Sequence, residues 1–222
     1  MMETEKYRLV VASGPTREWI DPVRFITNPS SGKTGWAIAS LGRTMFRETI
    51  YISGPGKEEY RTVKGATNIH VETTAEMAKE VFHSISDYTI LFMAAAPADF
   101  TPVRHSTIKI KKRYRRSLNV KLKPTTDILL SAGTKYTHLD HFYKVGFAAE
   151  TDNVLEHALE KVKRKKCDYV CANLVFKEDK GFGEHENSLM IVDKKGITMT
   201  IGPFNKDVLA GKLLDFIVRS IV

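Results

Sequence analysis

The segment Tyr7-Arg-Leu-Val-Val-Ala-Ser13 is a short run rich in branched apolar side chains, and it stops at Gly14-Pro15. An apolar run of this length in front of turn residues is typical of a buried strand. A polar stretch follows, and residues 35–43 then carry small and apolar side chains at helical spacing. The sequence therefore predicts a strand, a polar loop and a helix, with Ser30 and Ser31 as candidate helix caps.

The alternation of strand and helix continues along the chain. Thr73 and Glu76 form a capping-box pattern, which opens a helix with Met77, Val81 and Phe82 on one face. Further strands are predicted at residues 48–53, 68–72, 88–94, 143–147 and 169–172. A helix is predicted at residues 153–164, with inward side chains at Val154, Leu155, Ala158, Leu159 and Val162. This alternation predicts an α/β fold, a mostly parallel sheet with helices on both faces.

A basic segment interrupts this rhythm. Residues 104–123 are rich in lysine and arginine, and Leu118, Val120 and Leu122 alternate with polar residues as in a half-exposed antiparallel strand. We expect a basic antiparallel hairpin, called the flap below, at about residues 103–125. A second hairpin is expected at residues 188–201 and a closing helix at 206–220. No linker divides the chain, so we expect one domain over residues 1–222.

The composition limits the class of protein. The chain of 222 residues has 34 lysines and arginines against 26 acidic residues, a formal net charge of +8. This excess suits an anionic partner, either nucleic acid or small phosphorylated substrates. No apolar run approaches the roughly 20 residues that span a bilayer. The polar, acidic N-terminus is unlike a signal peptide, and two cysteines cannot supply a disulfide framework. We therefore expect a cytoplasmic protein with no membrane partner.

Three segments at predicted strand ends have residue types that suit a ligand site. Glycine, serine and lysine gather between Gly14 and Lys33, where backbone N–H groups and a helix dipole favour an anion. A Walker phosphate-binding loop needs a glycine where Thr27 stands, so that motif is excluded. Small residues and an acid end two other strands, at 94–99 and 146–151. The alternative interpretation of each segment is structural, as a solvated loop, helix cap or turn acid.

The lysines and cysteines leave similar alternatives. The run 109–112 (KIKK) has three alternative interpretations. It is a solvated surface, it contacts nucleic acid, or one of its lysines neutralises charge at a phosphorylated reaction centre. Lys161 and Lys165 share a helix face, where they increase solubility or bind phosphates. Cys167 and Cys171 lack a second ligand pair, so a zinc site is not expected and the metal ligands remain unknown.

Taken in order, these motifs resemble the phosphopantothenoylcysteine synthetase (phosphopantothenate–cysteine ligase) family. The matching segments are SGPTREWIDPVRFITNPSSGKTG, AAAPADF, KIKK, TDIL, VGFAAET and ANLVF, followed by GFG and Asn187. The family's frequent fusion partner, a flavin-dependent decarboxylase that precedes the ligase, is absent, so the chain resembles the stand-alone form. The resemblance implies a Rossmann-like fold, a homodimer and a need for Mg²⁺.

The resemblance also implies a reaction in two steps. A nucleoside triphosphate, CTP in the bacterial-type enzymes, activates the carboxylate of 4′-phosphopantothenate as an acyl-nucleotide and releases pyrophosphate. The amine of cysteine then displaces the nucleoside monophosphate. ATP remains the alternative to CTP, and a separate phosphopantothenoylcysteine decarboxylase is expected to act next in the pathway.

Matching by motif implies roles for individual residues. The catalytic residues of the family match Asn28, Arg24 and Lys109, and the family's lysine lies on a mobile flap. Nucleotide contacts match at Met93, Ala94, Ala95, Asp99, Lys109, Thr126, Asp127, Ile128, Leu129, Phe147, Lys161 and Lys165. Contacts with the acyl substrate match at Gly14, Asn28, Ser30, Ser31, Gly32 and Ala96.

Two other classes of function remain open. The net charge and the cluster from Lys109 to Arg116 suit a nucleic-acid-binding module, but Tyr114 is its one aromatic residue for stacking on bases. A nucleotide-dependent oxidoreductase has the same fold, but no G-x-G-x-x-G follows the first strand. We expect no nucleic-acid partner. Release of pyrophosphate with phosphopantothenate and a triphosphate separates the ligase from both alternatives.

Overall fold

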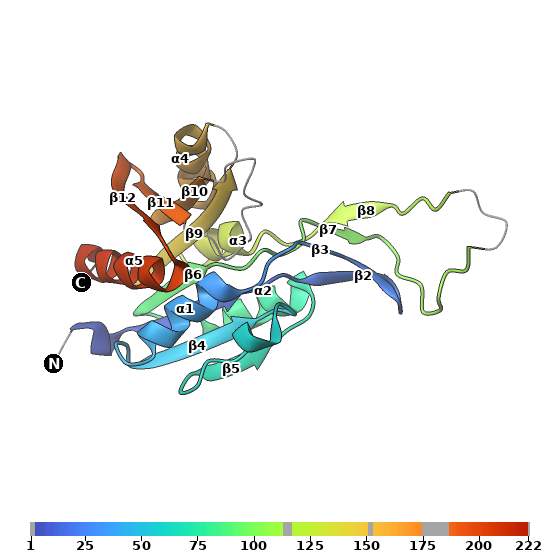
Figure 1. The fold of residues 1–222 in the computed structure, drawn as a ribbon, viewed down its shortest axis with the longest axis horizontal. Helices are drawn as coiled ribbons and strands as arrows, with labels where there is room; N and C mark the ends of the chain where they lie inside the picture. Colours follow the sequence, from blue (N-terminus) through green and yellow to red (C-terminus); the bar gives the residue numbers. More distant parts are fainter. Residues whose placement is uncertain (1–2, 113–116, 151–152, 175–186, 222) are drawn as a thin grey trace.

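An eight-stranded sheet forms the centre of the molecule (Figure 1). The computed structural model describes residues 3–112, 117–150, 153–174 and 187–221. The strand order is β12-β11-β10-β9-β6-β1-β4-β5. The parallel strands are β1 (Arg8–Ser13), β4 (Glu48–Ser53), β5 (Thr67–His70), β6 (Thr89–Met93), β9 (Phe142–Glu150) and β10 (Tyr169–Leu174). At one edge, β11 (Asn187–Asp193) and β12 (Gly196–Phe204) form the expected antiparallel hairpin.

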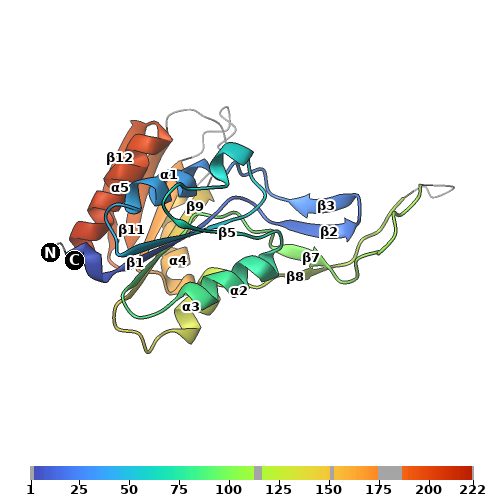
Figure 2. The same cartoon turned by 90° about the horizontal axis from the view of Figure 1, so that it is seen from below.

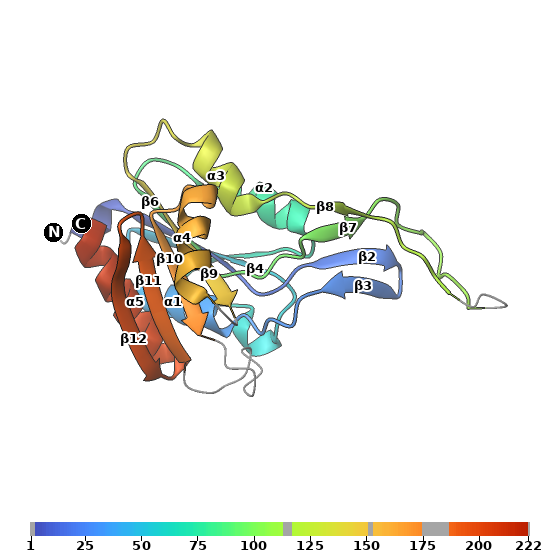
Figure 3. The same ribbon diagram turned by 90° about the horizontal axis from the view of Figure 1, so that it is seen from above.

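Helices cover both faces of this sheet (Figures 1 and 3). One face packs against α1 (Lys33–Gly42) and α5 (Lys206–Ile221), and the other against α2 (Thr74–Ser84), α3 (Ile128–Lys135) and α4 (Val154–Lys165). Two short 3-10 helices lie at Glu3–Lys6 and Glu58–Tyr60. This arrangement confirms the predicted α/β, Rossmann-like fold. No helix in the described ranges combines the length and the apolar composition that crossing a membrane requires.

The position of β1 explains its continuous apolar sequence. Leu9 and Val11 belong to the apolar cluster beneath α1 and α5, whereas Val10 and Ala12 belong to the cluster on the opposite face. All four side chains are fully buried. A central parallel strand that is covered on both faces needs apolar residues at every position rather than at alternate ones. The short run that ends at Gly14-Pro15 therefore identifies the middle of the sheet.

Two antiparallel hairpins project from one end of the body (Figures 1 and 2). β2 (Arg17–Asp21) pairs with β3 (Arg24–Thr27), and β7 (Phe100–Pro102) pairs with β8 (Leu122–Pro124). We call residues 17–27 and 100–124 together the arm. Antiparallel pairing in the flap agrees with the prediction, but β8 is shorter than expected, and Leu118 and Val120 precede it.

The prediction of a polar loop between β1 and α1 was wrong, because β2 and β3 form a hairpin there. Its apolar side chains pack against each other instead of entering the core. The ring centroids of Trp19 and Phe25 lie 5.0 Å apart, and the guanidinium of Arg17 lies 4.6 Å from the Phe25 ring centroid. A hairpin outside the core does not need the apolar alternation by which strands are recognised.

Three further local expectations can be compared with the structure. The capping box is confirmed, since Thr73 Oγ1 accepts a hydrogen bond from the Glu76 backbone N–H at 3.2 Å. The N-cap of α1 is Gly32 rather than Ser30 or Ser31. Leu155 is 36% exposed and does not point inward, because the buried stripe of α4 runs through Val154, Ala158 and Val162. Helix α3 was not expected.

Candidate active site

The candidate site lies at the edge of the sheet where β1, β6, β9 and β10 end. Open α/β sheets bind ligands outside the carboxyl ends of their parallel strands. Two cavities adjoin there, one of about 430 Å³ and one of about 410 Å³. We call the first the α1 cavity and the second the α3 cavity. They share the residues Ala95, Pro97, Asp99, Phe147 and Lys161.

The α1 cavity lies between the first turns of α1 and α5. Its lining combines small side chains at the end of β6 with polar residues before α1 and apolar residues of α5. The lining residues are Asn28, Ser30, Ser31, Gly32, Lys33, Thr34, Ala94, Ala95, Ala96, Pro97, Asp99, Phe147, Ala148, Lys161, Asn173, Leu189, Lys206, Leu209, Ala210 and Leu213.

The start of α1 is fitted closely to the end of β1. Gly32 has a left-handed backbone (φ 86°), and its carbonyl accepts a hydrogen bond from Ser13 Oγ at 2.8 Å. A Cβ on Gly35 would come within 2.4 Å of Ser13 Oγ, so only glycine fits at this position. A glycine cap brings no side-chain acceptor, although Ser31 Oγ accepts from the Lys33 N–H at 3.3 Å. The first turn of α1 is therefore suited to bind an anion.

Asn28 connects the end of β3 to the segment after β6. Its Nδ2 donates hydrogen bonds to the backbone oxygens of Ala96 at 3.3 Å and Pro97 at 3.0 Å. The Ala96 N–H in turn donates to the Gly14 oxygen at 2.9 Å. The amide of Asn28 thus fixes the backbone on which the small side chains of the α1 cavity are carried.

The α3 cavity lies beside the first turn of α3. Its lining residues are Met93, Ala95, Pro97, Ala98, Asp99, Phe100, Pro124, Thr125, Thr126, Asp127, Ile128, Leu129, Phe147, Lys161, Arg164 and Lys165. Asp127 caps α3 by accepting from the Leu130 N–H at 3.1 Å, and it forms an ion pair with Lys165. Lys161 Nζ donates to the Phe147 oxygen at 2.6 Å. The cap explains why Thr126 and Asp127 precede a helix.

Cationic side chains outnumber carboxylates in both linings. Lys33, Lys161 and Lys206 face one carboxylate, Asp99, in the α1 cavity. In the α3 cavity, Lys161, Arg164 and Lys165 accompany Asp99 and Asp127. Positive charge in a partly enclosed cavity concentrates anionic ligands. Lys161 lines both cavities, so it lies where a ligand that occupies the two would pass from one to the other.

Most of the residues marked by the resemblance line these cavities. The residues found in the α1 cavity are Asn28, Ser30, Ser31, Gly32, Ala94, Ala95, Ala96, Asp99, Phe147 and Lys161. Those in the α3 cavity are Met93, Ala95, Asp99, Thr126, Asp127, Ile128, Leu129, Phe147, Lys161 and Lys165. Gly14 lines neither cavity, and its backbone oxygen accepts the hydrogen bond from the Ala96 N–H. The GFG segment of the resemblance, residues 181–183, lies outside the described residues.

Arg24 and Lys109 also line neither cavity. Both residues are exposed and lie on the arm, Arg24 at the start of β3 and Lys109 in the flap. Within one chain, the structure therefore does not bring these two expected catalytic residues together with Asn28. The guanidinium of Arg24 instead contacts Asp21 and the backbone oxygen of Ile110.

Sequence reasoning missed Lys33, Arg164, Asn173 and Lys206 as lining residues. Lys33 was counted in the predicted anion-binding loop but not among the residues matched to a ligand, and Asn173 stands inside a quoted motif but was given no role. Lys206 begins the closing helix, and nothing in its local sequence indicates that α5 crosses the start of α1. The side-chain Oδ1 of Asn173 is buried and has no hydrogen-bond partner within the part of the chain that the structure describes, as expected of a group beside a polar ligand.

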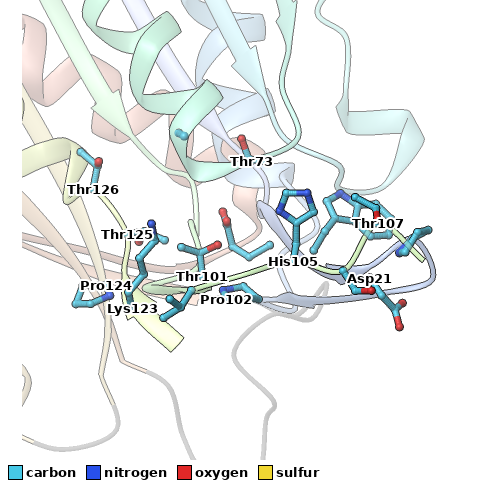
Figure 4. A pocket seen from close by; sticks show the side chains of 16 residues that line it. Asp21, Thr73, Thr101, Pro102, His105, Thr107, Lys123, Pro124, Thr125 and Thr126 are labelled. Atoms are coloured by element: carbon cyan, nitrogen blue, oxygen red, sulfur yellow. The ribbon is translucent and has the colours of Figure 1, made fainter. Parts of the chain in front are cut away.

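A larger cavity of about 880 Å³, the arm cavity, lies at the base of the arm (Figure 4). Its carboxylates already have structural partners. Glu18 Oε1 accepts from the Thr74 N–H at 2.8 Å, and Asp21 pairs with Arg24. Two basic side chains, His105 and Lys123, line it. The smaller cavities, with their groups of lysines, are therefore better suited to phosphorylated ligands.

Metal ligands are few in this part of the molecule. Among the residues that the structure describes, no three His, Cys, Asp or Glu side chains are grouped to hold a metal ion. Asp99 is the carboxylate common to both cavities. Mg²⁺ keeps several waters and is commonly bound by one or two carboxylates together with substrate phosphates. The lining therefore fits a Mg²⁺ ion that is bound mainly by a nucleotide.

Comparison with known proteins relates this chain to one family. The family model of the DNA/pantothenate metabolism flavoprotein C-terminal domain matches residues 4–221. The coenzyme A biosynthesis bifunctional protein CoaBC of Vibrio cholerae is 35% identical over 211 residues, which cover 95% of this chain and 52% of that protein. The chain thus spans about half the length of the curated relatives it matches.

Solved structures show the same fold. The crystal structure of the C-terminal domain of CoaBC has a TM-score of 0.80 and 30% identity, and the match covers 99% of this chain and 98% of that one. A mutant of Cab2 in complex with phosphopantothenate-cysteine has a TM-score of 0.68 and 15% identity, covering 97% and 89% of the two chains. At this low identity, the second match supports the fold alone.

Proposed function

This chain belongs to the DNA/pantothenate metabolism flavoprotein C-terminal domain family, and from that membership we propose that it is a phosphopantothenate–cysteine ligase of coenzyme A biosynthesis. The name of the Vibrio cholerae relative supports the pathway. The observation that carries the proposal is the pair of adjoining, lysine-lined cavities at the carboxyl ends of the strands. Every substrate that such a ligase uses before cysteine is an anion, and these cavities suit anions.

The proposed reaction has two steps. A carboxylate oxygen of 4′-phosphopantothenate attacks the α-phosphorus of CTP, the bond from that phosphorus to the bridging oxygen breaks, and pyrophosphate leaves. The amine of cysteine then attacks the acyl carbon, loses a proton and displaces CMP. The first turn of α1 binds a phosphate group, and the α3 cavity holds the nucleoside. The small side chains of Ala94, Ala95 and Ala96 let the ligand approach the backbone.

Lys161 has a central part in this proposal. It lines both cavities, and its bond to the Phe147 oxygen holds the ammonium at their junction. The α-phosphorus must lie where the acyl substrate and the nucleoside meet, which places it near that junction. An ammonium held there stabilises negative charge as pyrophosphate departs. Such preorganised groups commonly contribute about 10²–10³ in rate.

Lys109 is proposed to supply further positive charge from the flap, and Arg24 and Asn28 are proposed as catalytic residues. Because Arg24 and Lys109 lie on the arm, away from the two cavities, one chain alone does not complete this set. Lys109→Gln should lower the rate of pyrophosphate release by about 10²–10³. The neighbouring Lys111→Gln makes the same change in charge and should have a smaller effect.

We propose a homodimer in which arms from two copies pack together. The arm exposes apolar side chains that the body does not cover: Val23, Phe100, Val103, Ile108, Leu118 and Leu122, each at least 41% exposed. Exposed apolar clusters of this kind mark association surfaces. The dimer would also bring the arm residues of one copy toward the cavities of the other. Sedimentation equilibrium of the wild type and of Ile108→Asp tests the dimer, which the aspartate should dissociate.

The nucleotide and the metal are also proposals. We propose CTP as the preferred triphosphate because the KIKK run resembles the bacterial type. Turnover with CTP and ATP at equal concentration tests this preference, and faster turnover with ATP contradicts it. Mg²⁺ is proposed to be bound by the nucleotide phosphates and by Asp99, whose carboxylate lines both cavities.

The cellular setting follows from the proposed chemistry. The product keeps the carboxylate of cysteine, so decarboxylation is the expected next reaction. Cys167 and Cys171 are buried free thiols, as expected in a reducing compartment. We therefore propose a cytoplasmic location, where nucleotides and cysteine are available.

One assay tests the proposed function. The chain is mixed with Mg²⁺, CTP and 4′-phosphopantothenate, and pyrophosphate is measured before and after cysteine is added. The expected result is pyrophosphate release that requires phosphopantothenate, and 4′-phosphopantothenoylcysteine once cysteine is present. Absence of both products refutes the ligase, and tight binding of a DNA or RNA duplex under the same conditions would favour the nucleic-acid alternative.

A further inference from the structure

Asp21, at the end of β2, contacts the flap across a wide gap in sequence. Its Oδ2 accepts a hydrogen bond from the Ile110 backbone N–H at 3.0 Å. Arg24 Nη2 donates to the backbone oxygen of the same residue at 2.7 Å. The two side chains therefore hold the N–H and the C=O of a single flap residue, which directly follows Lys109 in the chain.

Asp21 is built into this position. Its side chain is 0% exposed, whereas that of its ion-pair partner Arg24 is 42% exposed. The Arg24 guanidinium, together with backbone N–H groups that include that of Ile110, lowers the pKa of the Asp21 carboxyl well below its ordinary value. The carboxylate is therefore ionised at neutral pH and accepts hydrogen bonds with its full charge.

The two carboxylate oxygens have separate tasks. Oδ1 accepts from the backbone N–H groups of Val23 at 2.9 Å and Arg24 at 3.0 Å, and so shapes the turn between β2 and β3. Oδ2 faces the guanidinium of Arg24 and the N–H of Ile110. One oxygen thus serves the hairpin and the other serves the flap.

A second contact supports the same segment of the flap. The Ser106 N–H donates to the Ile20 oxygen at 2.9 Å, next to Asp21 in β2. Ser106 Oγ also donates to the Ile108 oxygen at 2.6 Å. Figure 4 shows Asp21 in the same part of the arm cavity as His105 and Thr107. The flap is therefore attached to the β2–β3 hairpin on both sides of Lys109.

We infer that Asp21 is a positioning residue, which holds the peptide of Ile110 and thereby fixes where the Lys109 side chain leaves the arm. This inference rests on the proposed function, in which Lys109 acts on the activation step. An ammonium lowers a barrier most when it is already in place as charge develops. A flap released from Asp21 would have to order itself in each turnover, which lowers kcat more than it weakens substrate binding.

Asp21→Asn tests this inference selectively. An asparagine can keep its Oδ1 on the Val23 and Arg24 N–H groups, so the turn retains its acceptor. Its NH₂ group then faces the Ile110 N–H and the Arg24 guanidinium, and donor opposes donor. The matched control is Asp215→Asn, which removes an exposed pair with Arg219 on α5, far along the chain from the arm. Thermal unfolding of each variant verifies that the fold persists.

We expect Asp21→Asn to lower kcat for pyrophosphate release about tenfold with KM changed less than twofold. Hydrogen exchange of peptides within residues 104–112 should accelerate in Asp21→Asn and stay unchanged in Asp215→Asn. In a Lys109→Gln background, adding Asp21→Asn should change kcat less than twofold, because the ammonium that it positions is gone. In a Lys111→Gln background, the tenfold loss should persist.

Several results would overturn the inference. A tenfold loss that also persists in the Lys109→Gln background means that Asp21 does not act through Lys109. An Asp21→Asn variant as active as the wild type, or one with unchanged exchange in the flap, refutes the positioning role. A wild-type chain that releases no pyrophosphate refutes the proposed function instead, so the two failures are distinguishable.

Discussion

Replacing Gly54 by alanine should destabilise the chain and damage the α1 cavity at once. Gly54 follows β4, and its N–H donates to the Ser13 oxygen at 2.9 Å. A Cβ at this position would lie 1.7 Å from the backbone oxygen of Pro15 and 2.9 Å from its carbon. Pro15 pairs with Ala96 in an isolated bridge, so the clash falls on the backbone that connects β1 to the site.

The magnitude follows from what must move. Real Cβ atoms essentially never come closer than 3.0 Å to such a neighbour, so the Pro15 carbonyl has to shift by more than 1 Å. Inserting a methyl group into a packed interior commonly costs about 1–3 kcal/mol, and a clash with backbone belongs at the upper end. For a chain of this size, about 3 kcal/mol corresponds to a fall in Tm of about 6–12 °C.

Gly211→Ala is the matched control for this change. A Cβ on Gly211 would lie 3.7 Å from Leu41 Cδ1, an ordinary contact, and the residue is inside helix α5. Alanine is favoured over glycine inside a helix by about 0.5–1 kcal/mol, so Tm should stay constant or rise. Calorimetry measures both variants, and pyrophosphate release well below Tm should fall in Gly54→Ala alone. A Tm for Gly54→Ala within about 1 °C of the wild type would refute the reasoning.

Three further predictions concern single side chains. Asn28→Asp replaces an amide donor by a carboxylate. Because Asn28 is proposed to act on the anionic acyl-nucleotide, pyrophosphate should still be released while the product with cysteine falls. Mass spectrometry of the trapped acyl-nucleotide measures this. Lys161→Met should lower kcat for pyrophosphate release about 10²–10³-fold, whereas the exposed Lys163→Met should change it less than about twofold in steady-state assays. Burial raises the pKa of the Cys167 thiol to about 12 and also raises that of Cys171. Both thiols are therefore neutral at pH 8.5, and iodoacetamide should alkylate them in urea but not in the native chain.

The central sheet could be predicted because the burial of each strand is reflected in its own short stretch of sequence. Strands that are buried on both faces need continuous apolar runs, and the run 9–12 shows this in four consecutive residues, all fully buried. The capping box at Thr73 and Glu76 is likewise a pattern of neighbours, and the structure shows both of its hydrogen bonds. Features that depend on residues close in sequence were therefore recognised.

The arm could not be predicted in the same way. The β2–β3 hairpin packs Trp19 against Phe25 outside the core, so no periodic burial marks its strands. Helix α3 has eight residues and follows β8 closely, which gives a short apolar stretch that resembles a strand as much as a helix. The contact of Asp21 with Ile110 joins residues 89 positions apart, and nothing in either segment indicates the other.

The candidate site was predicted in part. The motifs identified residues at the ends of three strands, β1, β6 and β9, and the parallel sheet brings those ends to one edge. Lys206 was missed because its place in the α1 cavity depends on where α5 crosses α1. Lys109 was expected on the flap, and Arg24 was expected near Asn28 because both belong to one motif, but the structure places Arg24 on the arm as well. The sequence therefore indicated many residues that line the two cavities, but it did not indicate that a hairpin carries Arg24 away from them.

The positive side chains are divided between the body and the arm, and the two groups can serve different steps of the proposed reaction. Lys33 and Lys161 line cavities whose walls are the sheet and its helices, so their charge is fixed relative to the strand ends. Lys109 belongs to the flap, in which Ser106 and Ile110 form hydrogen bonds with the β2–β3 hairpin. A ligase of the proposed kind must bind its anions and later release them. Lysines fixed in the body suit the binding of anions. A lysine on a separately attached flap can approach the phosphates during activation and move away when the products are released. The strength of the Asp21 attachment should then set a compromise, because a looser flap slows activation and a tighter one slows the release of products.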